Sequence, residues 1–148
     1  MTLKHTNAKL LIHTEMFSDG EKSEIDTVCD AQYEKRDNVV QLTYLEPRMD
    51  EPEECLTNVE IDEEGVWIRR SGEIEASMRY EPGKLHKFVY NFDFGMLTLE
   101  AYTYEYECQL DDTGGYVHLN YMLDYGTQKA KVDLTIKIKE VNNGIDYH

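Results

Sequence analysis

An arginine stands among apolar residues in the stretch VWIRRSGEIEASMRYEPG, residues 66–83. If this stretch is one extended strand, alternate residues share a face, and Arg70 falls on the same face as Ile68 and Met78. A guanidinium does not lose its charge, so inside a protein it must meet a carboxylate, carbonyl groups or a bound anion. Arg70 is therefore a candidate for recognising an anionic ligand. The alternatives are a structural ion pair and a position at the mouth of the interior, where its head reaches water.

Tyrosines are the second group of residues that could bind a ligand. The chain has 11 of them, and five fall in rows that we expect to face the interior: Tyr80, Tyr90, Tyr104, Tyr106 and Tyr121. A phenol that lines a cavity offers its hydroxyl to a ligand, although aromatic rows mostly pack a core. We predict that Tyr80, Tyr90 and Tyr121 bind a small molecule together with Arg70, with packing as the alternative.

No other pattern is typical of a catalytic or metal site. The histidines show no metal-ligand spacing. The acidic clusters at residues 50–54, 62–64 and 111–112 lie in predicted loops, and none matches the spacing of a calcium loop. The sequence also lacks a glycine-rich phosphate loop, a G-x-S-x-G motif and a paired-cysteine zinc motif. We therefore assign no catalytic residue, no metal and no cofactor.

The length and charge of the chain limit its class. A chain of 148 residues can bury a sizeable core, and we expect a single domain over residues 1–148. Lys and Arg number 15 against 30 Asp and Glu, and the resulting net charge of -15 repels nucleic acid and anionic lipid. The start, MTLKHTNAKLLIHTEMF, lacks the apolar run of a signal peptide, and no window approaches a membrane span. We expect a cytoplasmic protein with neither a nucleic-acid nor a membrane partner.

The three cysteines are typical of a reducing compartment. Cys29, Cys55 and Cys108 are widely spaced and form no C-x-x-C pair. Each has the parity of the apolar residues in its segment. We interpret them as small buried thiols, with a metal or redox role as the alternative.

Strands must position these side chains. Apolar and polar residues alternate in the segments 8–17, 24–33, 39–46, 55–62, 115–125 and 131–141, which is typical of half-buried antiparallel strands. Turn sequences separate the segments: SDGE at 18–21, RDN at 36–38, DEEG at 62–65, EPGK at 81–84 and DDTGG at 111–115. The stretch EPRMDEPEECL, residues 46–56, has two prolines and five acids and is expected to be an exposed loop.

The parity of residues 66–80 decides how Gly72 is used. A two-residue hairpin at Ser71-Gly72 would pair the apolar row of one arm with the polar row of the other. One continuous strand instead places every even-numbered residue from Val66 to Tyr80 on a single face. We therefore predict one long strand in which Gly72 permits a sharp bend.

Residues 96–110 predict a second irregular strand. The apolar row changes parity near Tyr102, with Ala101 before the change and Tyr104 after it, and a β-bulge has this effect. About nine antiparallel segments, two of them long and bent and none covered by a helix, can bury one face by closing on themselves. The predicted fold is all-β, a closed antiparallel up-and-down β-barrel of eight or more strands. A two-sheet sandwich is the alternative.

Four short motifs follow one another along the chain: RSG at 70–72 with Met78 and Tyr80, YNFDFGMLTL at 90–99, GYVHLNYML at 115–123, and DLTIKIKE at 133–140. Taken together, they resemble the YwiB-like family of uncharacterised bacterial proteins over residues 8–141. The resemblance implies a calycin-type, lipocalin-like β-barrel and a cytoplasmic bacterial protein, but no established activity and no catalytic residues. Lipocalins carry G-x-W on their first strand, whereas the only Trp here is Trp67, so the transport of lipocalin ligands is not implied.

Three functions remain open. The first is a barrel that binds a small apolar or weakly anionic molecule, with Arg70, Tyr80 and Tyr90 as polar contacts. The second is a barrel filled by its own side chains that acts as a protein interaction module through an exposed edge or its acidic loops. The third is an enzyme with an interior Tyr/Arg site, which requires an acid or base within hydrogen-bond reach of Arg70 or Tyr90. A cavity of a few hundred Å³ favours the first function, and a packed interior favours the second.

Overall fold

The structure is a computed structural model that describes residue 3, residues 5–47 and residues 54–141. Strands dominate this part of the chain, and it holds no helix long and apolar enough to cross a membrane. The strands are β1 (Ala8–Ser18), β2 (Glu21–Arg36), β3 (Val39–Pro47), β4 (Glu54–Ile61), β5 (Val66–Ser71), β6 (Ala76–Tyr80), β7 (Leu85–Phe92), β8 (Gly95–Asp111), β9 (Gly114–Asp124) and β10 (Lys129–Glu140).

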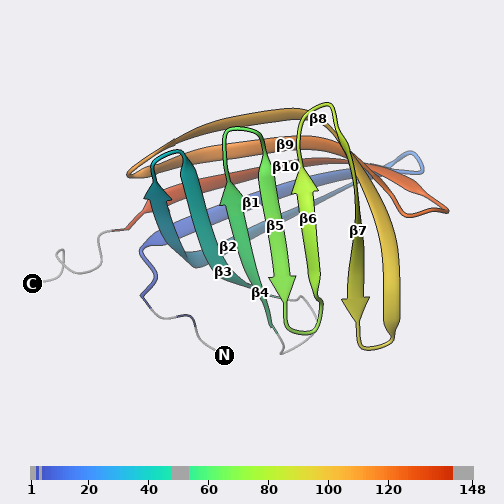
Figure 1. Cartoon of the computed structure of the whole chain (residues 1–148), viewed down its shortest axis with the longest axis horizontal. Coiled ribbons are helices and arrows are strands. Elements are labelled where there is room, and N and C mark those ends of the chain that lie inside the picture. Colours follow the sequence, from blue (N-terminus) through green and yellow to red (C-terminus); the bar gives the residue numbers. More distant parts are fainter. Residues whose placement is uncertain (1–2, 4, 48–53, 142–148) are drawn as a thin grey trace, which may run out of the picture.

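The ten strands form one antiparallel sheet that curls into a nearly closed barrel. Their order is β6-β5-β4-β3-β2-β1-β10-β9-β8-β7, so every pair of sequence neighbours except β6 and β7 forms a ladder, and β1 pairs with β10. This last ladder runs from Ala8 and Glu140 to Phe17 and Lys131. Figure 1 shows β3 to β7 in front of β8, β9, β10, β1 and β2, and crossing them steeply. The prediction of an all-β, antiparallel up-and-down barrel of eight or more strands is confirmed.

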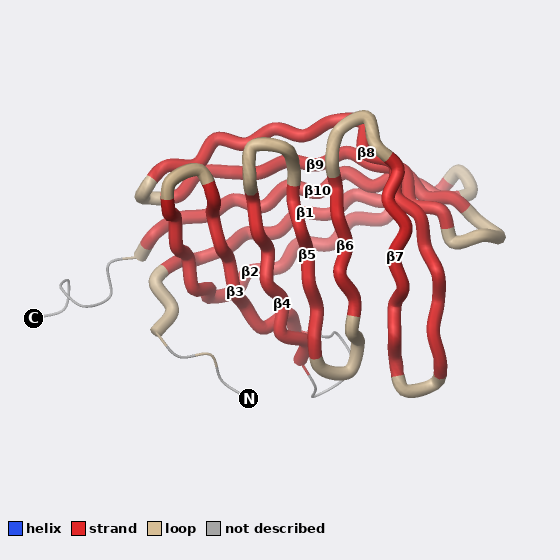
Figure 2. The backbone as a smooth tube through the Cα atoms, viewed as in Figure 1, coloured by secondary structure: helices blue, strands red, loops and turns tan. Residues whose placement is uncertain are grey.

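The strands at the two ends of this order, β6 and β7, meet without a continuous ladder. A single bridge joins Glu75 to Asn91, with N···O distances of 2.8 and 2.9 Å. Farther along, the Gly83 amide donates to the Thr103 carbonyl at 2.8 Å. Among the described residues, no ladder pairs β6 with β7. We call this boundary the β6–β7 seam; Figure 2 shows the β7–β8 hairpin extending away from it.

Alternation along each strand places one row of side chains inside the barrel. These rows supply the buried core, which includes Leu10, Leu42, Val59, Met78, Leu119 and Ile136. The longest strand, β8, has 17 residues and belongs to both layers, because its first half pairs with β7 and its second half with β9. Figure 1 shows β8 bending as it passes from one layer to the other.

A β-bulge in β8 accompanies this bend. The pairing register with β9 shifts between Thr103 and Glu105, which confirms the irregularity predicted near Tyr102. The prediction that Tyr104 then faces the interior is wrong. Tyr104 is the extra residue of the bulge, its side chain is 50% exposed, and its ring packs edge-on against Tyr102. Thr103 occupies the interior position and is fully buried.

The predicted single strand from Val66 to Tyr80 is also wrong. The chain reverses after Ser71, and β5 and β6 pair antiparallel, from Val66 with Tyr80 to Arg70 with Ala76. Because five residues, an odd number, separate the paired Arg70 and Ala76, partners have the same parity, and the even-numbered row stays on the inner face of both strands. A two-residue connection, which is even, would have mismatched the rows. Gly72 has a φ of 120°, a conformation that favours glycine, so it belongs to a turn and not to a bent strand.

The predicted turns are confirmed, but one strand was missed. All five turn sequences join consecutive strands, whereas Leu85–Phe92 is a strand that the alternation did not single out. Residues 62–64 and 111–112 lie in or beside turns as expected, while 48–53 lie outside the described residues.

Of the three predicted buried thiols, Cys55 is buried and Cys29 is half-buried, but Cys108 is exposed. The prediction of a buried Cys108 is wrong because this inward residue lies near an open end of the barrel, beside Val40 and Ile61 in a groove.

Candidate functional site

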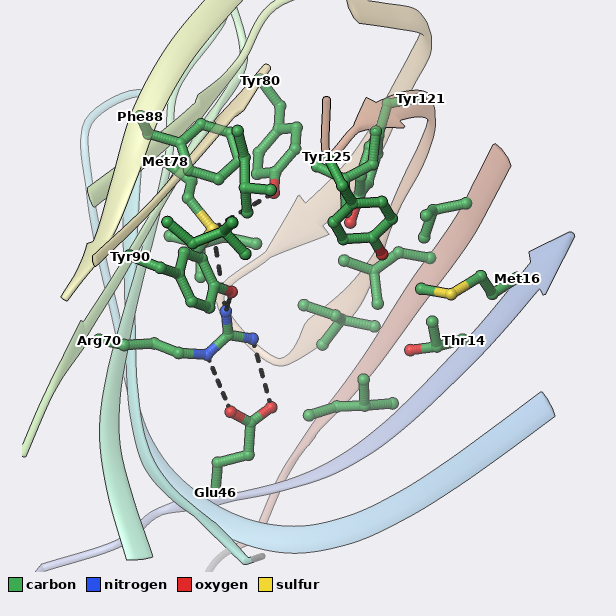
Figure 3. A pocket seen from close by; sticks show the side chains of 18 of the residues that line it. Thr14, Met16, Glu46, Arg70, Met78, Tyr80, Phe88, Tyr90, Tyr121 and Tyr125 are labelled. Carbon is green, nitrogen blue, oxygen red and sulfur yellow. Dashed lines mark hydrogen bonds and ion pairs between the residues drawn. The ribbon is translucent and has the colours of Figure 1, made fainter. Parts of the chain in front are cut away.

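The barrel holds a cavity of about 320 Å³. Its walls come from every strand except β2 and β4, and they are mostly aliphatic and aromatic. The four residues predicted to bind a ligand all line this one cavity: Arg70, Tyr80, Tyr90 and Tyr121 (Figure 3). The fold therefore brings them together, and ligand binding by them stays a prediction.

The Arg70 guanidinium forms an ion pair with Glu46. The Arg70 Nε donates to Glu46 Oε2 at 2.9 Å, and Nη2 lies 3.5 Å from Oε1 (Figure 3). The two residues stand on β5 and β3, with β4 between them. Thr57 on β4 is the direct partner of Arg70, and Cys55 on β4 is the partner of Glu46. Because both β4 side chains are small, the long arginine side chain can reach across to the glutamate.

Tyr90 and Met78 complete the surroundings of Arg70. The Arg70 Nη1 donates to the Tyr90 hydroxyl at 2.7 Å and lies 3.8 Å from the Met78 sulfur. Burial acts to lower the pKa of Arg70, but Tyr90 and Glu46 outweigh burial and raise that pKa above its ordinary value. Burial raises the pKa of Tyr90, although the arginine charge opposes this. The pair is thus a charged guanidinium beside a neutral phenol.

Tyr80 and Tyr121 form the aromatic part of the site. Their ring centroids lie 4.5 Å apart with the planes tilted by 43°. The Tyr80 hydroxyl lies 3.5 Å from the Met78 sulfur. Burial raises the pKa of Tyr80 well above its ordinary value, and it raises the pKa of Tyr121 to about 12. Both phenols are therefore neutral hydrogen-bonding groups across the physiological range.

The lining residues that the sequence analysis did not name as candidates include Tyr44, Glu46 and Tyr125. Glu46 ends the predicted strand 39–46 and begins the predicted loop 46–56; its place in an exposed loop is wrong, because it lies in β3 and continues the inward row of Leu42 and Tyr44. Continuing the alternation by one step would have found it. Tyr125 follows the inward residues Tyr121 and Leu123 of β9 in the same way. Conversely, Tyr106 lies outside this cavity and donates to the Asp62 carbonyl at 2.6 Å.

The arrangement is better suited to binding than to proton transfer. Figure 3 shows Arg70 and Tyr90 on one side of the cavity, with Tyr121 and Tyr125 facing them from the other. Since the Tyr90 oxygen accepts from Arg70, its hydroxyl hydrogen can be donated elsewhere. Glu46 meets the distance condition for an acid or base beside Arg70, but its two oxygens serve as the counter-ion of the guanidinium. A carboxylate held in this way is poorly placed to take a proton from a substrate.

A second cluster of polar residues lies on the outer face of β1 and β2. Ligand atoms of His13, Glu15 and Glu24 lie within 4.8 Å of one another. Sequence spacing missed the group because Glu24 comes from the neighbouring strand. Its cation is Lys22, whose ammonium lies 2.7 Å from both Glu15 and Glu24. We interpret the group as a surface network of ion pairs.

Comparison with known proteins gives a family and a fold. A family model described as "Domain of unknown function (DUF1934)" matches residues 11–138. A search of curated proteins gives no match. The crystal structure of the ywiB protein from Bacillus subtilis is similar, with a TM-score of 0.83 and 24% sequence identity over 91% of this chain and 92% of that chain. This likeness shows the same barrel fold, and the resemblance to the YwiB-like family is confirmed. Because the family model spans most of its length, the chain belongs to the DUF1934 family.

Proposed function

We propose that this protein binds a small, mostly apolar molecule inside its barrel. The observation that carries the proposal is the cavity of about 320 Å³, whose apolar walls surround one polar cluster of Arg70, Glu46 and Tyr90. Pockets for small molecules have this composition, in which apolar surface supplies affinity and a few polar groups fix the orientation. The absence of a disulfide among the three cysteines is consistent with a cytoplasmic setting.

The cavity limits the size of the ligand. At the roughly 30 Å³ that a water molecule takes in the liquid, the space admits about ten non-hydrogen atoms. A chain of eight carbons with a small polar head, or a single substituted aromatic ring, has this size. Larger ligands would require side chains of the cavity wall to move.

The polar groups limit the chemistry of the ligand head. Tyr90, Tyr121 and Tyr125 bring hydroxyl groups to the cavity, and Arg70 adds N–H donors. Each hydroxyl can donate as well as accept, whereas Glu46, the one carboxylate among the residues that line the cavity, already accepts from Arg70, so hydroxyl donors remain for a ligand. The head that fits best is a hydrogen-bond acceptor such as a carbonyl or carboxyl group, placed between Tyr90 and the tyrosines opposite.

Native mass spectrometry of protein purified from cells without detergent tests the proposal. We expect a bound molecule of the size of about ten non-hydrogen atoms. A variant with Leu99→Trp, which fills the cavity from the β8 wall, should lose it. Protein that carries no ligand and also fails to bind either octanamide or octanoate in calorimetry would favour a barrel that works through its surface.

A further inference from the structure

The charges that line the cavity balance one another. Among the described residues that line it, Arg70 is the cation and Glu46 is the anion, and all others are uncharged. The side chains of Arg70 and Glu46 are 21% and 31% exposed, so both charges are largely removed from water. The interior of the barrel is therefore close to electrically neutral without a ligand.

A ligand with its own negative charge would upset this balance. Its attraction to Arg70 is offset by its repulsion from Glu46, because the two charged groups are in contact. The desolvation of the ligand carboxylate, which costs several kcal/mol per buried ion, then remains uncompensated. The net charge of -15 on the whole chain adds a repulsion of the same sign.

A ligand carboxylate could bind Arg70 by displacing the Glu46 carboxylate, but this exchange is unfavourable. The guanidinium would lose its counter-ion unless the ligand replaced it in the same geometry. Arg70 is held by Tyr90 and Met78 on its other side, at 2.7 and 3.8 Å, so it cannot follow a ligand placed deeper in the cavity. An uncharged acceptor needs no such exchange, because the Tyr90 hydroxyl can donate to it while the ion pair stays intact.

We infer that the ligand is an uncharged acceptor, such as an amide, ester, ketone or aldehyde with an apolar body, and that Glu46 is the residue that excludes carboxylates. The inference rests on the proposed function and narrows the head group of the ligand from a carbonyl or carboxyl group to an uncharged acceptor. Glu46 would determine specificity because it neutralises the Arg70 guanidinium and repels a ligand carboxylate. Proteins often use such an unfavourable contact to discriminate between similar ligands.

Octanamide and octanoate provide a matched pair of probes. They have the same shape and number of non-hydrogen atoms, and at about pH 7.5 only octanoate is charged. We expect isothermal titration calorimetry to give an affinity for octanamide that is on the order of 100-fold higher than for octanoate. Equal affinities would overturn the inference and leave the proposed function in place. If neither probe binds, the proposed function fails, and the inference fails with it.

Glu46→Gln tests whether this residue is the cause. The substitution keeps the shape and leaves Arg70 without a counter-charge, so the ratio of octanamide to octanoate affinity should fall by at least about tenfold. Glu63→Gln is the matched control, because it removes one negative charge from the exposed β4–β5 turn. That control should keep the wild-type ratio. A ratio unchanged in Glu46→Gln would show that Glu46 does not set the preference.

Glu46→Gln could fail to fold because its arginine is unpaired. In that case the variant is refolded with each probe, since a ligand that binds the native state stabilises it. We expect octanoate, which supplies the missing negative charge, to restore folding at lower concentration than octanamide. The reverse order would overturn the role given to Glu46.

Discussion

Arg70 on β5 contacts Glu46 on β3 across the intervening strand β4, at 2.9 Å between Nε and Oε2. Cross-strand ion pairs usually join directly opposed residues, whereas this one spans two strand spacings. It is possible because Thr57 and Cys55 leave room on the inner face of β4. The ion pair thus ties three neighbouring strands together at the edge of the cavity.

Breaking this ion pair should destabilise the barrel. Arg70→Leu leaves the Glu46 carboxylate without its cation, and we expect the free energy of unfolding to fall by about 2 kcal/mol, less than for a fully buried pair. The double variant Arg70→Leu with Glu46→Leu removes both charges and should lose less than the single variant. Urea unfolding of the wild type, Arg70→Leu, Glu46→Leu and the double variant measures the coupling. Strictly additive losses would mean that the two side chains do not interact.

The fully buried Thr57 hydroxyl has no hydrogen-bond partner among the residues that the structure describes. A buried hydroxyl without a partner is unfavourable, so Thr57→Val should raise the free energy of unfolding by about 1 kcal/mol. Thr43→Val is the matched control on the adjacent strand, since the Thr43 hydroxyl accepts from the Asn58 amide at 3.1 Å. The control should be destabilising by about 1 kcal/mol. A loss of stability in Thr57→Val would show that its hydroxyl is hydrogen-bonded after all.

His13 should make stability depend on pH. The hydrogen bond to Asp26, at 2.5 Å, raises the pKa of His13 above its ordinary value, with the charges of Asp26, Glu15 and Glu24 acting in the same direction. Protonated His13 therefore stabilises the folded state fully below about pH 6.5, and this contribution is lost as the pH rises through the folded pKa.

Two measurements check the role of His13. An NMR titration should give a pKa above about 6.5 for His13 in the wild type, and a lower one in Asp26→Asn. Between about pH 6 and pH 8.5, the urea midpoint should fall more in the wild type than in Asp26→Asn. Parallel pH profiles for the two proteins would contradict the prediction.

Gly72 distinguishes a turn from a bent strand. Its φ of 120° is strained for any residue with a Cβ atom, so Gly72→Ala should lower the free energy of unfolding by about 1 kcal/mol or more. In a continuous strand the same substitution would be neutral or stabilising. Ser71→Ala, at the neighbouring exposed position, is the control and should change stability little. Thermal unfolding is sufficient to rank the three proteins.

The alternation of apolar and polar side chains accounts for most of what could be predicted from the sequence. It placed Arg70, Met78 and Tyr80 on the inner face even though the single strand proposed for them is a hairpin. The reason is physical, because a hairpin with partners of equal parity and an unbroken strand give the same inward row. Side-chain alternation therefore identifies the face of a residue without identifying the path of the backbone. The Ser71-Gly72 dipeptide marks the reversal but does not give its length, because five residues separate the last pair, Arg70 and Ala76.

The rest of the site depends on contacts that no local pattern contains. Glu46 becomes the partner of Arg70 only when β3, β4 and β5 lie side by side. The acidic residues that follow Glu46 in the sequence indicated a solvated loop, although the alternation of β3 continues through Glu46. In the same way, His13 meets Asp26 and Glu24 through the β1–β2 pairing, which spacing along one strand cannot show.

The pairing of β1 with β10 has a consequence for synthesis of the protein. Ala8 and its partner Glu140 are far apart in the sequence, so the edge of β1 that faces β10 stays unpaired until the strands between them and β10 itself have been synthesised. Nine strands can form their hairpins while this edge is still open to other chains. The pairing of β1 with β10 is thus a late step between distant parts of the chain. The interior of the barrel is complete only after β10 has been translated.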